Sequence, residues 1–279
     1  MIKRISKIFF NIAVISVVVA ALFAVLRRSE SYPQKEVEDS APAPQENVQQ
    51  AQIVQEEKQI DKDKKEVVAQ ENPSPEEIIL PKDIVLEVPF VLQAPFANWD
   101  DPLFQDACEE AAILMAKGWL EGQKDFTKER MESGIRDIAI LEEKILGGHI
   151  DASAFDTAGI LKEYADNEKV RVDENVKLED VKTEILKGNL VIVPTNGRKL
   201  GNPFYTAPGP VTHMIVIIGY DGESKEFITN DSGTRRGEGY RYGENVLFGA
   251  IRDYPTGNHY TDPIDERGAK KAMIVIERK

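Results

Sequence analysis

The chain has few residues that could form a disulfide or a metal site: its 279 residues include one cysteine and three histidines. A single cysteine cannot form an internal disulfide, so Cys108 is an intermolecular cross-link, an inert buried residue or a reactive group. His149 and His259 are far apart and lack ligand-like neighbours, so we expect no metal and no cofactor. A Gly-Lys-Ser/Thr phosphate-binding loop is also missing, which argues against an ATP-binding module.

Positive charge is also scarce. The chain has 35 Lys and Arg against 48 Asp and Glu, which gives a net charge of -13. Nucleic-acid binding depends on clustered Lys and Arg that neutralise phosphates, and no basic stripe is present. We therefore expect no nucleic-acid partner.

An apolar run without a charge covers residues 8–26, between basic residues on both sides. At about 1.5 Å per residue it nearly spans a hydrocarbon core of roughly 30 Å. A cleaved signal peptide is the alternative, but the run is long for one and no small-x-small cleavage site precedes Arg27. We therefore predict a single-pass signal anchor over residues 1–28, with the rest of the chain outside the cytoplasm.

Residues 29–82 contain no Gly, Phe or Trp and are rich in Gln, Glu, Lys and Pro. Such a segment cannot bury enough apolar surface to offset the entropy of ordering it. We predict a disordered linker over residues 29–82, followed by one globular domain over residues 83–279.

The hydrophobic pattern of this domain is first helical and later strand-like. A short strand is expected over residues 84–92, broken at Pro89. Helices are predicted over residues 106–120, 128–146, 153–164 and 178–187, the third with Ser153 and Asp156 in capping-box spacing. Strands are predicted over residues 190–194, 211–220, 226–230 and 272–277. This order predicts an α+β fold whose sheet packs on the helix that carries Cys108.

Cys108 stands at the expected start of the first helix, with Asp106 as the N-cap and Glu109 completing a capping box. A thiol there faces unsatisfied N–H groups and the positive end of the helix dipole, which can lower its pKa from about 8.5. The negative charges of Glu109 and Glu110 act in the opposite direction. Position alone therefore leaves Cys108 open as a nucleophile or as a small buried residue.

His213 lies in an apolar strand, where a histidine is often only a satisfied core residue. An Asp-Gly turn at residues 221–222 would join two strands in a hairpin. The numbers of two residues that face each other across this hairpin would then sum to about 443 to 445. His213 would then face residues 230–232, where Asn230 or Asp231 could orient the imidazole and fix its tautomer. A polar turn that simply ends the strand is the alternative.

A cysteine at a helix start, a later histidine and then an Asn or Asp follow the order of the papain-type triad. Four segments resemble the bacteriocin-processing peptidase family and its C39-like relatives. They are residues 88–93 (Val-Pro-Phe-Val-Leu-Gln), 107–112 (Ala-Cys-Glu-Glu-Ala-Ala), 212–214 (Thr-His-Met) and 229–231 (Thr-Asn-Asp). The resemblance covers roughly residues 84–279 and implies a papain-like cysteine peptidase fold.

The resemblance also implies four site residues, namely Cys108 as nucleophile, His213 as base, Asp231 as the residue that orients the histidine, and Gln93 as oxyanion donor. Many relatives have Cys-Gly-Pro where this chain has Cys-Glu-Glu. Gln105 is an alternative to Gln93, because Gln93 lies 15 residues before the cysteine. Asn230 is likewise an alternative to Asp231.

A cationic and aromatic cluster follows the expected histidine and acid strands. Its members are Arg235, Arg236, Tyr240, Arg241 and Tyr242. We expect a solvated loop here, and contact with a carboxylate-bearing substrate is the alternative.

Together these features predict a membrane-anchored cysteine peptidase or amidase outside the cytoplasm. It would hydrolyse a peptide, protein or cell-envelope amide through Cys108, His213 and Asp231. One alternative is transfer of the acyl group to an amine by the same thiol. Another is a tethered binding domain that has lost turnover, which Glu109 and Glu110 beside the thiol would favour.

Overall fold

The computed structural model describes residues 80–257 and 268–278 of the protein. The predicted signal anchor, residues 1–28, and the predicted linker up to residue 79 lie outside these ranges. Within these two ranges, no helix has both the length and the hydropathy that a membrane span requires.

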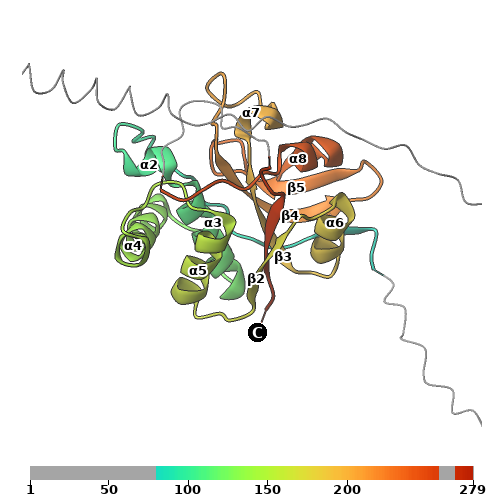
Figure 1. Cartoon of the computed structure of the whole chain (residues 1–279), viewed down its shortest axis with the longest axis horizontal. Coiled ribbons are helices and arrows are strands. Elements are labelled where there is room, and N and C mark those ends of the chain that lie inside the picture. Colours follow the sequence, from blue (N-terminus) through green and yellow to red (C-terminus); the bar gives the residue numbers. More distant parts are fainter. Residues whose placement is uncertain (1–79, 258–267, 279) are drawn as a thin grey trace, which may run out of the picture. The chain divides into compact units, whose positions relative to one another are not determined.

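An antiparallel sheet forms the centre of the fold (Figure 1). Its strands lie in the order β2 (Val170–Glu174), β7 (Ala272–Ile276), β3 (Leu190–Thr195), β4 (His213–Asp221), β5 (Glu226–Asn230) and β6 (Tyr240–Gly243). A further strand, β1 (Asp83–Val85), pairs with residues 219–221 of β4, while β3 pairs with residues 213–217 of the same strand. His213 is therefore the first residue of a central strand.

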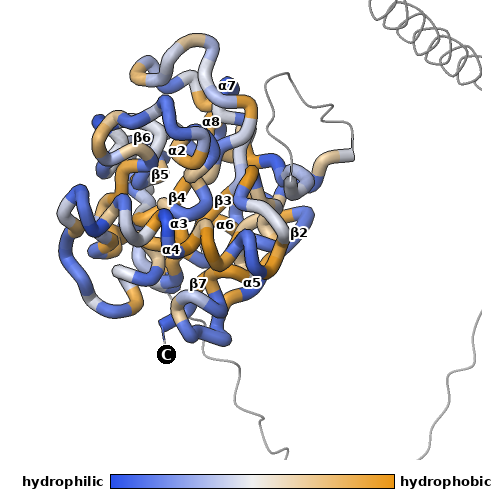
Figure 2. Tube along the Cα trace, turned by 90° about the vertical axis from the view of Figure 1, so that its left-hand side faces the viewer, coloured by the Kyte–Doolittle hydropathy of each residue, from blue (hydrophilic) through white to orange (hydrophobic). Residues whose placement is uncertain are grey.

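Helices cover both faces of the sheet (Figure 1). One face carries α3 (Cys108–Leu120), α4 (Lys128–Leu146) and α5 (Ala154–Ala165), and the other carries α6 (Leu178–Leu186) and α8 (Glu244–Ala250). Because side chains alternate along a strand, Val216 enters the first core and Ile217 the second. Figure 2 shows these hydrophobic strands inside a mostly hydrophilic periphery. The predicted α+β class is confirmed, whereas the second layer of helices was not predicted.

The helix that carries Cys108 begins later than the capping pattern predicts. A short helix, α2 (Leu103–Asp106), ends at Asp106, and Ala107 separates it from α3 with φ -84° and ψ 31°. No side chain caps α3, so the predicted capping box of Asp106 and Glu109 is wrong. Glu109 instead turns inward, because its carboxylate finds donors in the core. Ser153 does cap α5, accepting a hydrogen bond from the backbone N–H of Asp156 at 3.2 Å.

The first predicted strand is mostly not a strand. Only Asp83–Val85 pairs with the sheet, and the chain beyond it runs across to the end of β5. There the side-chain amide of Asn230 donates to the Val88 carbonyl at 3.2 Å, and the Gln93 N–H donates to the Ser232 carbonyl at 3.1 Å. This path, rather than strand pairing, positions Gln93.

The β4–β5 hairpin has a longer loop than the predicted Asp-Gly turn. Asp221 pairs with Glu226 and Val216 with Asn230, so the residue numbers sum to 447 and 446, and the predicted register is wrong. The Asp221 carboxylate accepts the N–H groups of Glu223 and Ser224, each at 3.1 Å, which closes a four-residue loop. Because the pairing with β5 ends at Val216 and Asn230, His213 at the start of β4 has no partner residue in β5.

Candidate active site

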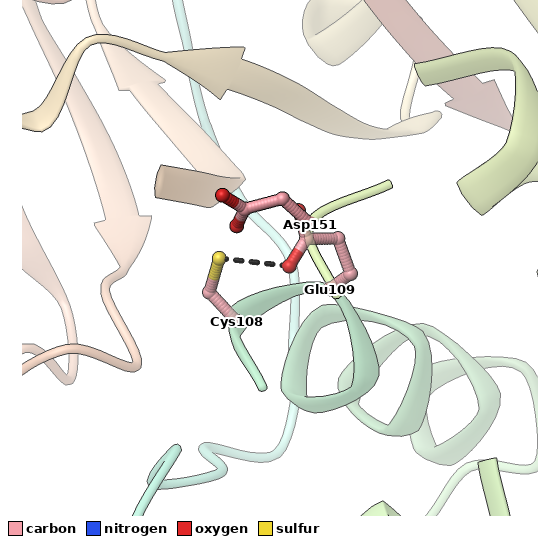
Figure 3. Close-up of side chains that lie close together, drawn as sticks. All are labelled: Cys108, Glu109 and Asp151. Carbon is pink, nitrogen blue, oxygen red and sulfur yellow. Dashed lines mark hydrogen bonds between the residues drawn. The ribbon is translucent and has the colours of Figure 1, made fainter. Parts of the chain in front are cut away.

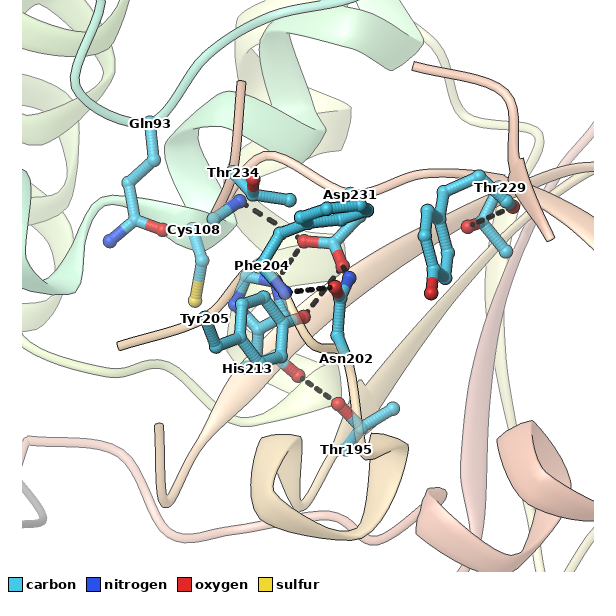
Figure 4. A network of polar contacts seen from close by, with 12 residues as sticks. Gln93, Cys108, Thr195, Asn202, Phe204, Tyr205, His213, Thr229, Asp231 and Thr234 are labelled. Carbon is cyan, nitrogen blue, oxygen red and sulfur yellow. Dashed lines mark hydrogen bonds and ion pairs between the residues drawn. The ribbon is translucent and has the colours of Figure 1, made fainter. Parts of the chain in front are cut away.

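A cleft of about 560 Å³ lies where the start of α3 meets the start of β4. Cys108, His213 and Gln93 all line it, although they come from separate parts of the sequence. Asp231 lies behind His213 and is 0% exposed. The fold therefore brings all four predicted site residues to one place (Figure 4).

His213 contacts Asp231 and not Asn230. The imidazole Nε2 lies 2.9 Å from Asp231 Oδ1 (Figure 4). The Asn230 side chain is committed elsewhere, because it donates to the Val88 carbonyl and accepts the Gly239 N–H. Of the two residues that the sequence leaves open, Asp231 is thus the one that contacts the histidine.

Asp231 is surrounded by hydrogen-bond donors. Its Oδ2 accepts from the hydroxyl of Tyr205 at 2.6 Å, from the hydroxyl of Tyr242 at 2.7 Å and from the Asn202 amide at 3.0 Å. Its Oδ1 accepts the Gly233 N–H at 3.1 Å as well as the His213 contact. Burial acts to raise the pKa of Asp231, but the charge of His213 and these hydrogen bonds hold the pKa below its ordinary value. Asp231 is therefore a buried carboxylate.

Two of these donors also shape the surroundings of the histidine. The Tyr205 ring packs edge-on against the imidazole, with 5.6 Å between centroids and 83° between planes. Tyr242 belongs to β6, so the predicted solvated loop is wrong at residues 240–243. Alternation along β6 explains this, because Tyr242 points into the core while Arg241 faces solvent and pairs with acids on β4 and β5.

Sequence reasoning missed Asn202 and Tyr205. Both lie between α7 (Gly197–Leu200) and β4, in a stretch that contains no regular element. Hydrophobic periodicity carries no information in such a stretch. The available signal was composition, since an Asn and a Tyr shortly before a candidate histidine strand offer the donors that a buried acid needs.

The thiol lies in an acidic environment. Cys108 is 3% exposed, and its Sγ donates to Glu109 Oε2 at 2.9 Å. The other oxygen of Glu109 accepts the Tyr254 hydroxyl at 2.6 Å and the Ala152 N–H at 3.2 Å. Asp151, just before α5, accepts the Thr212 hydroxyl at 2.7 Å.

This environment disfavours the thiolate. Burial raises the pKa of Cys108 well above its usual range, and the negative charges of Glu109 and Asp151 raise it further, whereas the Met214 N–H lowers it. Burial, together with the charge of Asp151, also raises the pKa of Glu109 to about 8. Near neutral pH the proton of Glu109 therefore stays in place, and the negative charge next to the sulfur is smaller than the number of carboxyl groups implies.

The side chains of Cys108, Glu109 and Asp151 also form a group that could hold a metal ion. One ligand atom each of Cys108, Glu109 and Asp151 lies within 4.8 Å of the other two (Figure 3), the one such group among the residues that the structure describes. An ion bound there would occupy the sulfur that the resemblance assigns to nucleophilic attack. The expectation that no metal is needed remains a prediction.

Both candidate oxyanion donors use their amide hydrogens on backbone carbonyls. Gln93 Nε2 donates to the carbonyls of Phe104 at 3.1 Å and Gln105 at 3.0 Å, and Figure 4 shows this nitrogen turned away from Cys108. Gln105 Nε2 donates to the Trp99 carbonyl at 3.0 Å. Both residues line the cleft, and the oxyanion role of Gln93 remains a prediction.

Comparison with known proteins gives one family. The model of the Peptidase_C39 like family matches residues 85–251, which include Gln93, Cys108, His213 and Asp231. The crystal structure of a "putative C39-like peptidase" from Bacillus anthracis is similar at 15% identity and a TM-score of 0.38, over 71% of this chain and 98% of that chain. None of the curated proteins matches. Because the family model spans more than half of its length, the chain belongs to the Peptidase_C39 like family.

Proposed function

We propose that the protein is a cysteine peptidase that cleaves an amide bond through Cys108, His213 and Asp231. The observation that carries the proposal is the His213–Asp231 pair, 2.9 Å apart, on the wall of a cleft that also holds the only thiol of the chain. A histidine needs an acceptor of fixed position on one nitrogen to present the other nitrogen to a substrate or nucleophile. Asp231 is such an acceptor, because four further donors hold its carboxylate in place.

In the proposed reaction His213 removes the proton of the Cys108 thiol. The sulfur attacks the carbonyl carbon, the carbon–nitrogen bond breaks, and His213 returns the proton to the departing amine. Water, deprotonated by His213, then cleaves the thioester and restores the thiol. The backbone N–H of Cys108, at the start of α3, is a candidate for holding the oxyanion.

Glu109 determines when this reaction can begin. When its carboxylate accepts the thiol proton, as in the 2.9 Å contact, that proton is bound to Glu109 and is not shared with His213. Because the pKa of Glu109 is raised to about 8, the carboxyl group is protonated at neutral pH and does not have to act as the acceptor. We propose that this neutral form is the active one.

The proposal includes the location of the enzyme. The apolar run over residues 8–26, its basic flanks and the Pro- and Glu-rich stretch after it support a membrane-anchored domain outside the cytoplasm. Membrane fractionation of cells that produce the full chain, with alkaline extraction, tests this. Release of the intact chain into the soluble fraction would contradict it.

A tethered binding domain is the second candidate, favoured by the raised pKa of Cys108 and its contact with Glu109. Alkylation by iodoacetamide separates the two, since Cys108 is the only thiol. We expect measurable alkylation of the wild type near pH 7, at least tenfold slower alkylation in His213→Ala, and no peptide cleavage by Cys108→Ala. An unreactive thiol in the folded, reduced wild type would instead support the binding domain.

A further inference from the structure

We infer, resting on the proposed peptidase function, that a side pocket of the cleft binds a carboxylate of the substrate on the amine side of the cleaved bond. This side pocket has a volume of about 220 Å³ and shares Trp99, Thr206 and Gly233 with the cleft that contains Cys108. Its walls combine a guanidinium, a buried hydroxyl and apolar side chains. Arg235 and Ser232 contribute the two polar groups, and the apolar part consists of Leu92, Ala94, Ala97, Trp99 and Phe204.

The side pocket lies on the histidine side of the cleft. Gly233 lines both cavities, and a Cβ atom added at Gly233 would lie 3.0 Å from His213 Cε1. In the proposed reaction His213 returns a proton to the departing amine, so the amine half of the substrate lies beside the imidazole. A substrate group that enters the side pocket therefore belongs to this half.

Ser232 gives the side pocket a hydroxyl that lacks a partner. The residue is 1% exposed, and among the described residues its Oγ has no hydrogen-bond partner. Its main chain is held in place, because its carbonyl accepts the Gln93 N–H at 3.1 Å. An unpaired buried hydroxyl is unfavourable, and a hydroxyl can donate to a carboxylate oxygen. A polar ligand in the side pocket would supply the missing partner.

Arg235 gives the side pocket its positive charge. It is exposed, and it is the one charged residue among the described residues that line this pocket. The Arg236 guanidinium lies over the Phe204 ring, 4.6 Å from its centroid, so a second cation borders the apolar wall. A guanidinium binds a carboxylate through two parallel N–H groups. The sequence left open whether this cationic cluster contacts a carboxylate-bearing substrate, and the side pocket gives Arg235 that role.

The cleft beside the side pocket has charges of both signs around it. Asp106 and Asp151 line the cleft, and Nη2 of the buried Arg252 donates to the carbonyl of Val211, a further lining residue, at 3.1 Å. None of these four residues lines the side pocket. Selection of a carboxylate therefore depends on Arg235 and its surroundings, and not on the balance of charge near the sulfur.

A carboxylate beside the departing amine can come from two sources. One is the side chain of an Asp or Glu residue directly after the cleaved bond. The other is the free C-terminus of a short leaving fragment. Both sources place the same chemical group in the side pocket, and two pairs of peptides separate them.

The binding test uses the full-length chain with Cys108→Ala, so that no acyl-enzyme forms, and four acetylated tripeptides. Ala-Gly-Glu amide is compared with Ala-Gly-Gln amide, and Ala-Gly-Ala with a free C-terminus is compared with its amide. Quenching of Trp99 reports binding, because the other tryptophan, Trp119, is 2% exposed. We expect the carboxylate member of at least one pair to bind about tenfold more tightly. Equal binding, or no binding, in both pairs would overturn the inference.

Variants in the same background show whether the side pocket is responsible. Arg235→Gln should abolish the preference for the carboxylate, and Ser232→Ala should reduce it several-fold. Both should fold, because Arg235 is exposed and the Ser232 hydroxyl has no partner to lose. Arg241→Gln is the matched control and should leave the preference unchanged, because Arg241 is exposed but pairs with acids on β4 and β5. A preference that survives Arg235→Gln would overturn the inference.

Cleavage of a mixture of random peptides by the wild type, followed by mass spectrometry, separates this inference from the proposed function. We expect the cleaved bonds to be enriched before Asp or Glu or next to a free C-terminus, and Arg235→Gln to remove the enrichment. Cleavage without such enrichment would overturn the inference and leave the peptidase proposal standing. Selective binding of carboxylate peptides without cleavage of any peptide would uphold the side pocket and contradict the peptidase proposal.

Discussion

On the β4–β5 side of the cleft Asp231 accepts five hydrogen bonds, whereas behind α3 Glu110 and Glu142 each keep a buried carboxyl oxygen without a donor. All three residues are at most 2% exposed. The pKa of Asp231 nevertheless lies below its ordinary value, while burial raises the pKa of Glu142 to about 7 and that of Glu110 well above its usual range. Burial alone therefore does not decide whether these acids are charged, because at Asp231 the charge of His213 and the surrounding hydrogen-bond donors outweigh it.

Glu109 lies between these two cases. It has donors in the Tyr254 hydroxyl, the Ala152 N–H and the Cys108 thiol, yet burial and the charge of Asp151 raise its pKa to about 8. The histidine side of the site thus has a fixed charge, and the thiol side has a charge that changes with pH.

Removing the negative charge of Asp231 should have the largest effect on activity. Asp231→Asn keeps the size of the side chain but removes the carboxylate that orients His213, and we expect kcat/KM to fall about 10³-fold. The measurement is cleavage of a peptide that the wild type cleaves, with thermal unfolding as a check on folding. Tyr242→Phe is the matched control, because it removes one donor to Asp231 and keeps the His213 contact, and it should cost only a few-fold. Activity of a folded Asp231→Asn variant within threefold of wild type would contradict the role of Asp231.

The second prediction concerns Glu110 and Glu142, which each keep one buried oxygen without a donor. The pKa of Glu142 is raised from 4.5 to about 7, so the unfolded chain loses this proton first and stability falls as pH rises from about 4.5 to 7. A shift of this size corresponds to about 3 kcal/mol. Glu142→Gln stays neutral and should lose this part of the pH dependence of the free energy of unfolding, measured with denaturant between pH 5 and 8.

Glu143→Gln is the control for this experiment, because Glu143 is the exposed neighbour of Glu142 on the same helix. It should follow the wild-type pH dependence. Equal pH dependence in wild type and Glu142→Gln would show that burial does not raise the pKa of Glu142 in the folded protein.

Much of the fold followed from periodicity. α4 has the predicted bounds and α5 the predicted cap, since long amphipathic runs with good caps determine their own structure. β2 and β6 were missed because each is short and carries charged residues, and only pairing with β7 and β5 makes them strands.

The site was predictable only in part. Cys108 and His213 stand out in the sequence, but Asn230 and Asp231 could not be told apart, because the register depended on a loop two residues longer than the Asp-Gly pattern indicates. The spacing of Asp106 and Glu109 predicts a capping box, so the sequence did not indicate that the Glu109 side chain points into the core. Whether such a residue caps a helix or joins the core depends on tertiary donors such as Tyr254, far along the chain.

The smallest predicted effect concerns the carboxyl group of Glu109, whose charge changes with pH. Below pH 8 the carboxyl group of Glu109 is neutral and disfavours the thiolate little, whereas above pH 8 its negative charge opposes thiolate formation. Glu109→Gln is neutral at every pH, so its iodoacetamide alkylation should match wild type near pH 6.5 and be about tenfold faster near pH 9, equivalent to about one pKa unit.

Glu110→Gln is the control for this charge effect, because Glu110 is equally buried but is not hydrogen-bonded to the sulfur, and it should change the rate less. Slower alkylation of Glu109→Gln at all pH values would mean that Glu109 is the base that takes the thiol proton. The site would then contain two alternative proton acceptors, and the contrast between a fixed histidine side and a pH-dependent thiol side would no longer hold.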